Sequence, residues 1–192
     1  MPQYLNIPNI LTSLRILVIP FLVLIFYLPY EWSYTVSALL FAVAGFTDWL
    51  DGYLARKLNQ ATPLGAFLDP VADKLMVAVA LALLIESHAN WALTIPALVI
   101  IGREIVVSAL REWMAEMGQR TSVAVSYIGK VKTTAQMLSI VILLANKPDW
   151  SNFVISGYIM LYIAVALTLW SMFLYIKAAW PFLRKSGTKS EA

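Results

Sequence analysis

Four aspartates stand within long apolar stretches of this chain: Asp48, Asp51, Asp69 and Asp73. One aspartate at the centre of a membrane helix costs about 2.5–3.5 kcal/mol, so an apolar chain keeps four only where something compensates their charge. Hydrophobic residues make up 60% of the chain and charged residues 13%, against about 45–50% and about 25% in soluble domains. We therefore expect an integral membrane protein in which two divalent cations would balance the four carboxylates.

Apolar runs of helical length divide the chain into six candidate transmembrane helices. A chain of 192 residues has room for about six spans of roughly 20 residues each. We predict these spans at residues 16–28, 34–55, 65–85, 91–114, 123–145 and 153–177. Before them, the apolar residues of 7–14 recur at helical spacing, which predicts a separate short helix along the membrane interface. The expected fold is all-α and polytopic, a single membrane domain over residues 1–192 with a flexible tail at about 184–192.

Basic residues are distributed unevenly over the five polar breaks between these spans. In the first, third and fifth breaks, Lys147 is the only lysine or arginine. The second and fourth breaks, their flanks and the C-terminal end contain Arg56, Lys57, Arg111, Arg120, Lys130, Lys132, Lys177, Arg184, Lys185 and Lys189. Because loops rich in lysine and arginine stay preferentially in the cytoplasm, both termini and the basic breaks are predicted to face it. The expected location is the cell (inner) membrane, with the aspartates at its cytoplasmic side.

The remaining composition excludes several kinds of partner and ligand. The chain has no cysteine, which excludes disulfides and thiolate metal ligands. Its one histidine, His88, falls in a break on the side away from the aspartates, so zinc is not expected. The net charge of +3 is small and follows from the orientation in the membrane, so no nucleic-acid partner is expected.

The spacing of the aspartates places them on shared helix faces. Residues three or four apart lie on one face of an α-helix, so Asp48 and Asp51 project together at the end of the second span. Gly65, Asp69 and Asp73 form a strip of the same kind at the start of the third span. Two antiparallel helices would thus present four carboxylates to one pocket. Hard oxygen ligands suit Mg²⁺ or Mn²⁺, and two such ions form a clamp for phosphoryl transfer.

Residues between the aspartates fit a phosphate ligand. Gly52 and Ala55 are small enough for a ligand to approach the helix closely, and the planar guanidinium of Arg56 matches a phosphate. The alternatives are helix packing for the small residues and salt bridges from the aspartates to Lys74, Arg56 or Arg103.

These residues together resemble the signature of the CDP-alcohol phosphotransferase family, and the resemblance covers nearly the whole chain. Every signature position is matched in Asp48-x2-Asp51-Gly52-x2-Ala55-Arg56-x8-Gly65-x3-Asp69-x3-Asp73. Further segments resemble the members of the family that use glycerol 3-phosphate: 6–12, 103–105, 108–113 and 123–132. The resemblance implies transfer of a phosphatidyl group from CDP-diacylglycerol to sn-glycerol 3-phosphate with release of CMP. It also implies two divalent cations, Mg²⁺ or Mn²⁺, a lipid-bilayer setting and a homodimer.

Residue roles follow from the matched positions. The resemblance implies metal ligation by Asp48, Asp51, Asp69 and Asp73. It further implies that Asp73 is the general base toward the acceptor hydroxyl. Contacts to CDP-diacylglycerol are implied for Gly52, Ala55, Arg56, Thr62, Gly65, Asn9 and Thr12. The candidates for binding the glycerol phosphate are Arg103, Arg111, Lys130 and Lys132, with pairing to Glu104, Glu112 or Glu116 as the alternative.

Two other functions remain open at this stage. A divalent-cation transporter would use the same four acids, but it leaves Arg56 and the second set of cations without a task. Another alcohol, such as inositol phosphate or serine, would use the same chemistry with a different acceptor. Serine has no phosphate for the second set of cations to bind, whereas inositol phosphate is set aside on the resemblance alone.

Overall fold

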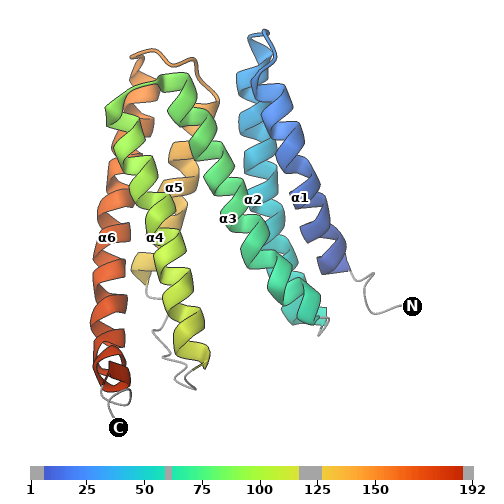
Figure 1. Cartoon of the computed structure of the whole chain (residues 1–192). Coiled ribbons are helices and arrows are strands. Elements are labelled where there is room, and N and C mark those ends of the chain that lie inside the picture. Colours follow the sequence, from blue (N-terminus) through green and yellow to red (C-terminus); the bar gives the residue numbers. More distant parts are fainter. Residues whose placement is uncertain (1–6, 59–61, 117–126, 188–192) are drawn as a thin grey trace.

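The computed structural model describes residues 7–58, 62–116 and 127–187. Within these ranges the description does not extend to the side chains of 7–9, 49, 51–58, 63, 64, 66, 127, 128, 130, 178, 179 and 181–187. The described residues form six α-helices and no strand, which confirms the all-α prediction (Figure 1). The helices are α1 (Ile7–Phe26), α2 (Trp32–Leu58), α3 (Pro63–His88), α4 (Trp91–Glu116), α5 (Tyr127–Leu144) and α6 (Asn152–Gly187).

Consecutive helices run up and down a bundle, and α3 lies between two groups of them (Figure 1). On one side α1 packs against both α2 and α3. On the other side α6 packs against α4 and α5, and α5 also contacts α2 and α3. We call the end at which α2 stops and α3 begins the aspartate end, and the other the opposite end. The first residue of α1 and the last residue of α6 both lie toward the aspartate end (Figure 1).

The core consists of aliphatic and aromatic side chains contributed by all six helices. Its largest fully buried members are Phe41, Leu22, Leu81, Leu84, Leu93, Ile100, Ile140, Leu143, Leu144, Leu161 and Val154. Large apolar side chains also cover the outside of the bundle, among them Leu24, Phe46, Ile95 and Phe173. An apolar exterior of this kind is stable in lipid rather than in water.

Among the described helices, two are long and apolar enough to cross a membrane by length and composition. These are α4 and the Asn152–Lys177 part of α6. The apolar parts of α1 and α5, Ile10–Phe26 and Val131–Leu144, are shorter. The helices α2 and α3 carry the aspartates, and charged groups of this kind are costly in hydrocarbon.

Two sequence-based boundaries differ from the structure. The separate interfacial helix predicted at 7–14 is wrong, because α1 is continuous from Ile7 to Phe26. The physical reason lies at Arg15, which is only 2% exposed and pairs with α2 instead of marking a break at the membrane surface. At the other end of the chain α6 continues to Gly187, so the first residues of the tail predicted from 184 are helical.

The start of α3 is fixed by local sequence. Thr62 has an extended backbone, and its side-chain hydroxyl accepts a hydrogen bond from the Gly65 amide at 3.0 Å. Pro63 follows at the first helical position, where a missing amide hydrogen costs nothing. This cap begins the helix two turns before Asp69 and three before Asp73, so both carboxylates lie at the aspartate end.

Candidate active site

The carboxylate of Asp48 is held by a cation from a helix far away in sequence. Arg15 on α1 donates from Nη1 to Asp48 Oδ1 on α2. The Arg15 side chain is 1% exposed, whereas the Asp48 side chain is 38% exposed and remains accessible. Arg15 is not among the site residues predicted from the sequence. The signal was present, because Arg15 is the only basic residue among the first 28 and lies inside an apolar run.

The carboxylate of Asp69 contacts the same helix. The Thr12 hydroxyl donates to Asp69 Oδ1, and Thr12 is fully buried. Thr12 and Arg15 are three residues apart on α1, so one face of that helix contacts both aspartate-bearing helices. A donor-substrate contact of Thr12 stays a prediction, since its hydroxyl lies here on a predicted metal ligand.

Asp73 lies one helical turn beyond Asp69 and interacts electrostatically with charges from four other helices. These charges are Arg15 of α1, Asp48 of α2, and Glu104 and Lys132 of α4 and α5. Asp73 is therefore within electrostatic range both of Asp48 and of charged groups in the second half of the bundle.

The cations of that half form a compact cluster around one carboxylate. Glu104 Oε2 accepts from Arg103 Nη1 at 3.1 Å and lies 3.8 Å from Lys132 Nζ. Arg103 and Lys132 are each 8% exposed. Pairing with Glu104 was the alternative to phosphate binding in the sequence, and both Arg103 and Lys132 make this pairing. Because one carboxylate is shared between two cations, positive charge remains for an anionic ligand.

The two arginines of α4 also contact α6. Arg103 Nη2 donates to Ser171 Oγ at 2.9 Å. Arg111 Nη2 donates to the Tyr175 hydroxyl, and its guanidinium carbon lies 4.8 Å from the centre of the Tyr175 ring. The sequence predicted the arginines but not these α6 residues. A serine and a tyrosine on an apolar helix carry no signal that they face a cation until the helices are packed.

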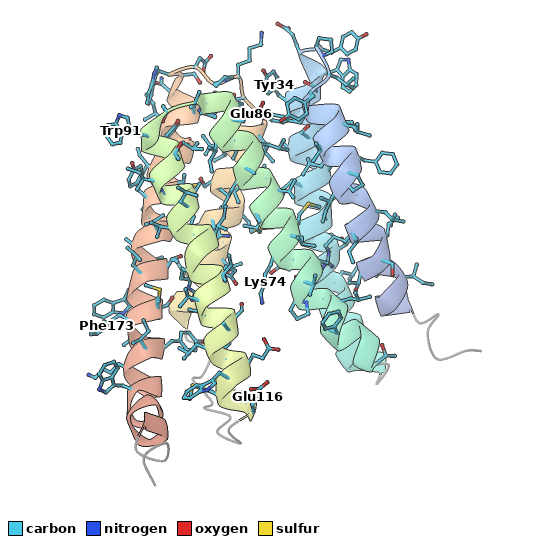
Figure 2. All side chains as sticks on the ribbon, in the orientation of Figure 1. Tyr34, Lys74, Glu86, Trp91, Glu116 and Phe173 are labelled. Atoms are coloured by element: carbon cyan, nitrogen blue, oxygen red, sulfur yellow. The ribbon has the colours of Figure 1, made fainter. Side chains whose placement is uncertain are left out.

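A cavity of about 490 Å³ lies between α3 and α4 next to this cluster. Its walls are mainly apolar, and Lys74 extends into the space between the two helices (Figure 2). Its polar lining also includes Glu104, Ser108 and Glu112. The volume is within the range of about 300–1,000 Å³ that is typical of ligand sites.

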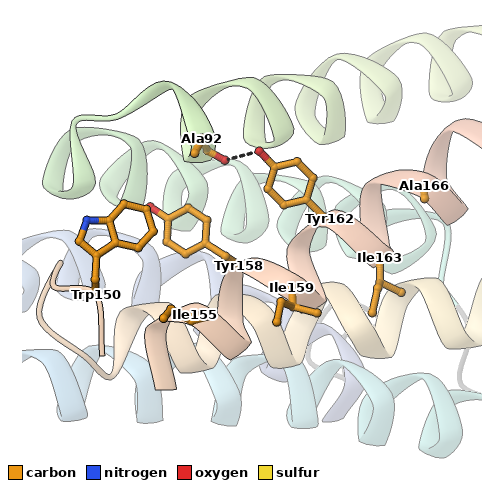
Figure 3. A pocket seen from close by; sticks show the side chains of 8 residues that line it. All are labelled: Ala92, Trp150, Ile155, Tyr158, Ile159, Tyr162, Ile163 and Ala166. Atoms are coloured by element: carbon orange, nitrogen blue, oxygen red, sulfur yellow. Dashed lines mark hydrogen bonds between the residues drawn. The ribbon is translucent and has the colours of Figure 1, made fainter. Parts of the chain in front are cut away.

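A larger cavity of about 600 Å³ lies at the opposite end and does not match the predicted site (Figure 3). It is lined only by apolar and aromatic residues: Ala92, Trp150, Ile155, Tyr158, Ile159, Tyr162, Ile163 and Ala166. Without a charged side chain it offers nothing to a diphosphate or a metal. Cavity size alone would therefore select the wrong end of the molecule.

Several predicted site residues have side chains outside the described part of the chain. They lie on described helices, with Asn9 on α1 and Lys130 on α5, and the rest on α2: Asp51, Gly52, Ala55 and Arg56. The described helical register of α2 still places Asp51 three residues beyond Asp48, on the same face. Two other predicted contacts to CDP-diacylglycerol are described at the start of α3. Thr62 caps the helix, and Gly65 is buried beside it.

The donor set at the aspartate end fits a hard divalent cation. Carboxylate oxygens from α2 and α3 are the preferred ligands of Mg²⁺ and Mn²⁺. The 38% exposure of Asp48 leaves it reachable for an ion. Among the described side chains no three acidic or histidine groups lie close enough to hold a metal, and Asp51 is not among them. Metal binding by the four aspartates therefore stays a prediction.

Known proteins of one family resemble this chain over most of its length. The family model for CDP-alcohol phosphatidyltransferase matches residues 5–170. A protein of Pseudomonas fluorescens is 61% identical over 186 residues, 96% of this chain and 95% of that protein. A relative from Yersinia enterocolitica is 58% identical over 92% of this chain and 96% of its own length. A relative from Salmonella choleraesuis is 55% identical over 91% of this chain and 94% of its own length. All three are named CDP-diacylglycerol--glycerol-3-phosphate 3-phosphatidyltransferase. The chain belongs to the CDP-alcohol phosphatidyltransferase family.

Proposed function

We propose that the protein transfers the phosphatidyl group of CDP-diacylglycerol to sn-glycerol 3-phosphate, giving phosphatidylglycerol phosphate and CMP. The observation that carries this proposal is that Asp73 interacts electrostatically both with Asp48 and with Glu104 and Lys132, which belong to the cluster around Arg103. The aspartates suit a diphosphate with its metals, and the cluster suits a second anion. Relatives at 55–61% identity bear the name of this activity.

On the donor side, the four aspartates hold two divalent cations, Mg²⁺ or Mn²⁺. Members of the family generally use divalent metals. When bound, such ions polarise phosphoryl oxygens and stabilise the charge of a leaving phosphate. Arg15 and Thr12 keep the Asp48 and Asp69 side chains in place from α1. The donor itself contacts the residues matched to the family signature: Gly52, Ala55, Arg56, Thr62, Gly65, Asn9 and Thr12.

On the acceptor side, the cations bind the phosphate of glycerol 3-phosphate. Arg103, Arg111 and Lys132, offset by Glu104, leave two positive charges. A phosphate monoester carries about 1.5–2 negative charges near pH 7, so the charges match. Lys130, two residues before Lys132 on α5, is proposed as a further phosphate contact.

The chemical step needs one proton acceptor at the junction of the two sides. The acceptor hydroxyl gives its proton to the Asp73 carboxylate, and its oxygen forms a bond to the β-phosphorus of CDP-diacylglycerol. The bond from that phosphorus to the bridging oxygen breaks, and CMP leaves with the bridging oxygen. Asp73 is suited to this role because it interacts electrostatically with Asp48 of the donor side and with Glu104 and Lys132 of the acceptor side.

The membrane arrangement follows from the charge distribution. We propose that all six helices cross the membrane of the bacterial cell, with the aspartate end and both termini in the cytoplasm. The basic residues Arg111 and Lys132 lie toward that end, whereas Trp91 and Trp150 lie at the other, as interfacial tryptophans do. The homodimer implied by the family resemblance is part of this proposal.

Purified protein in detergent tests the function. We expect CMP release from CDP-diacylglycerol only when both a divalent metal and glycerol 3-phosphate are present. EDTA should abolish the release, and added Mg²⁺ or Mn²⁺ should restore it. Serine and inositol phosphate serve as competing acceptors, and product from either one in place of glycerol 3-phosphate would overturn the substrate assignment. Metal flux in liposomes without CMP release would support the transporter instead.

A further inference from the structure

Two side chains of α6 contact the arginines assigned to the acceptor phosphate. Ser171 and Tyr175 are four residues apart, so they lie on one face of α6. Ser171 meets Arg103 and Tyr175 meets Arg111. The two helices are packed together, so both contacts belong to one helix interface.

The Ser171 hydroxyl is oriented for its contact. It donates to the Thr168 carbonyl oxygen, one turn earlier on α6, at 2.9 Å. With its hydrogen used in that bond, its oxygen lone pairs are free to accept from Arg103 Nη2 at 2.9 Å. Arg103 is thereby held on both sides, by Glu104 through Nη1 and by Ser171 through Nη2. Its buried Nε has no hydrogen-bond partner among the described residues.

Tyr175 contacts Arg111 in two ways. Its hydroxyl accepts a hydrogen bond from Arg111 Nη2. Its ring centre also lies 4.8 Å from the guanidinium carbon, within the range of a cation–π contact. Arg111 is exposed, and the hydroxyl and ring of Tyr175 both hold its guanidinium against α6.

We propose that Ser171 and Tyr175 are positioning residues that hold Arg103 and Arg111 ready for the acceptor phosphate. This inference rests on the proposed function. A free arginine side chain samples many rotamers, and ordering it on binding weakens affinity. Contacts made before the substrate arrives remove part of that loss. In this way α6, which carries no residue of the family signature, contributes to acceptor affinity.

Two single substitutions test the proposal in purified, detergent-solubilised protein. Ser171→Ala removes the acceptor for Arg103, and Tyr175→Phe removes the hydroxyl but keeps the ring. We expect each to raise the KM for glycerol 3-phosphate about three- to fivefold, less than loss of the arginine itself, because each acts only through its arginine. The KM for CDP-diacylglycerol should change less than about twofold, and Ser171→Thr, which keeps the hydroxyl, should retain the wild-type value.

The same helix offers matched controls. The Ser156 hydroxyl donates to the Phe153 carbonyl oxygen at 2.6 Å, in the same way as Ser171, but far from the arginines. The Tyr162 hydroxyl donates to the Ala92 carbonyl oxygen at 3.0 Å, again between α6 and α4 (Figure 3). Ser156→Ala and Tyr162→Phe should leave both KM values unchanged. Thermal unfolding of all five variants identifies any effect that is merely structural.

A double-mutant cycle shows whether each residue acts through its arginine. If Ser171 acts through Arg103, Ser171→Ala should have no further effect on KM in an Arg103→Ala background. Tyr175→Phe should likewise have none in Arg111→Ala. Additive effects, an unchanged KM for glycerol 3-phosphate, or an equal rise for both substrates would overturn the positioning role. If the wild type makes no product from glycerol 3-phosphate, the proposed function fails instead, which is a different result.

Discussion

The two ends of the bundle each have an ion pair between different helices or loops, and the pairs differ in burial. At the aspartate end Arg15 is 1% exposed and Asp48 38%. At the opposite end Lys147 and Glu31 are 2.7 Å apart, with side chains 55% and 87% exposed. Both join segments far apart in sequence, but only the first takes a cation out of contact with solvent.

The difference in burial separates a surface ion pair from one at the candidate active site. An exposed pair contributes little to stability, because water and salt screen it. Here the hydrogen bond from Lys147 lowers the pKa of the Glu31 carboxyl, and both groups remain solvated. A buried cation has lost its hydration, and its partner only partly compensates for that loss. Arg15 is nevertheless buried, and its partner is a carboxylate of the candidate active site, so we expect the pair to orient that carboxylate.

The largest expected effect tests the aspartate end directly. Asp73→Asn keeps the shape of the side chain but removes its ability to accept the hydroxyl proton. We expect CMP release to fall by about a thousandfold or more, with thermal unfolding close to wild type. Asp149→Asn, which changes a carboxylate at the opposite end, is the control and should retain full activity. Activity of Asp73→Asn above about one per cent of wild type would exclude Asp73 as the base.

The second prediction compares the two ion pairs. Arg15→Met fills the same space without charge, so Asp48 loses the group that orients it. We expect the rate to fall about ten- to hundredfold, as loss of a hydrogen bond to a charged group predicts. Lys147→Met should keep the wild-type rate, measured in the same assay. Equal effects of the two substitutions would remove the distinction between the two ends.

The third prediction concerns the acceptor cations. Arg111→Ala should raise the KM for glycerol 3-phosphate about tenfold, because one charge-assisted contact to the phosphate is lost. The KM for CDP-diacylglycerol should change little. Lys177→Ala removes an exposed cation of α6 at the same end and is the matched control. A similar rise in both KM values for Arg111→Ala would contradict an acceptor role.

The smallest effect is expected at the exposed pair. Glu31→Gln removes the charge that Lys147 contacts, but both groups are already solvated. We expect the melting temperature in detergent to stay unchanged, and to remain so between low and high salt. A clear, salt-dependent loss of stability would show that the opposite end also depends on its ion pair.

Much of the fold could be predicted from the sequence. The apolar runs predicted all six helices in order, since hydropathy and helical spacing are local properties. The positions of Asp69 and Asp73 on α3 followed from the same spacing. The predicted break before residue 16 was wrong because Arg15 looks like a surface residue until α2 is placed beside it.

The helices, the register of the aspartates and the family of the chain could be read from the sequence alone. Only the packed helices show which side chains contact the site residues. Thr12 and Arg15 of α1 contact the aspartates, and Ser171 and Tyr175 of α6 contact the arginines of α4. The tertiary structure also decided that Glu104 is shared by Arg103 and Lys132. The physical reason is that helical periodicity acts over a few residues, whereas these contacts join residues brought together only when whole helices pack.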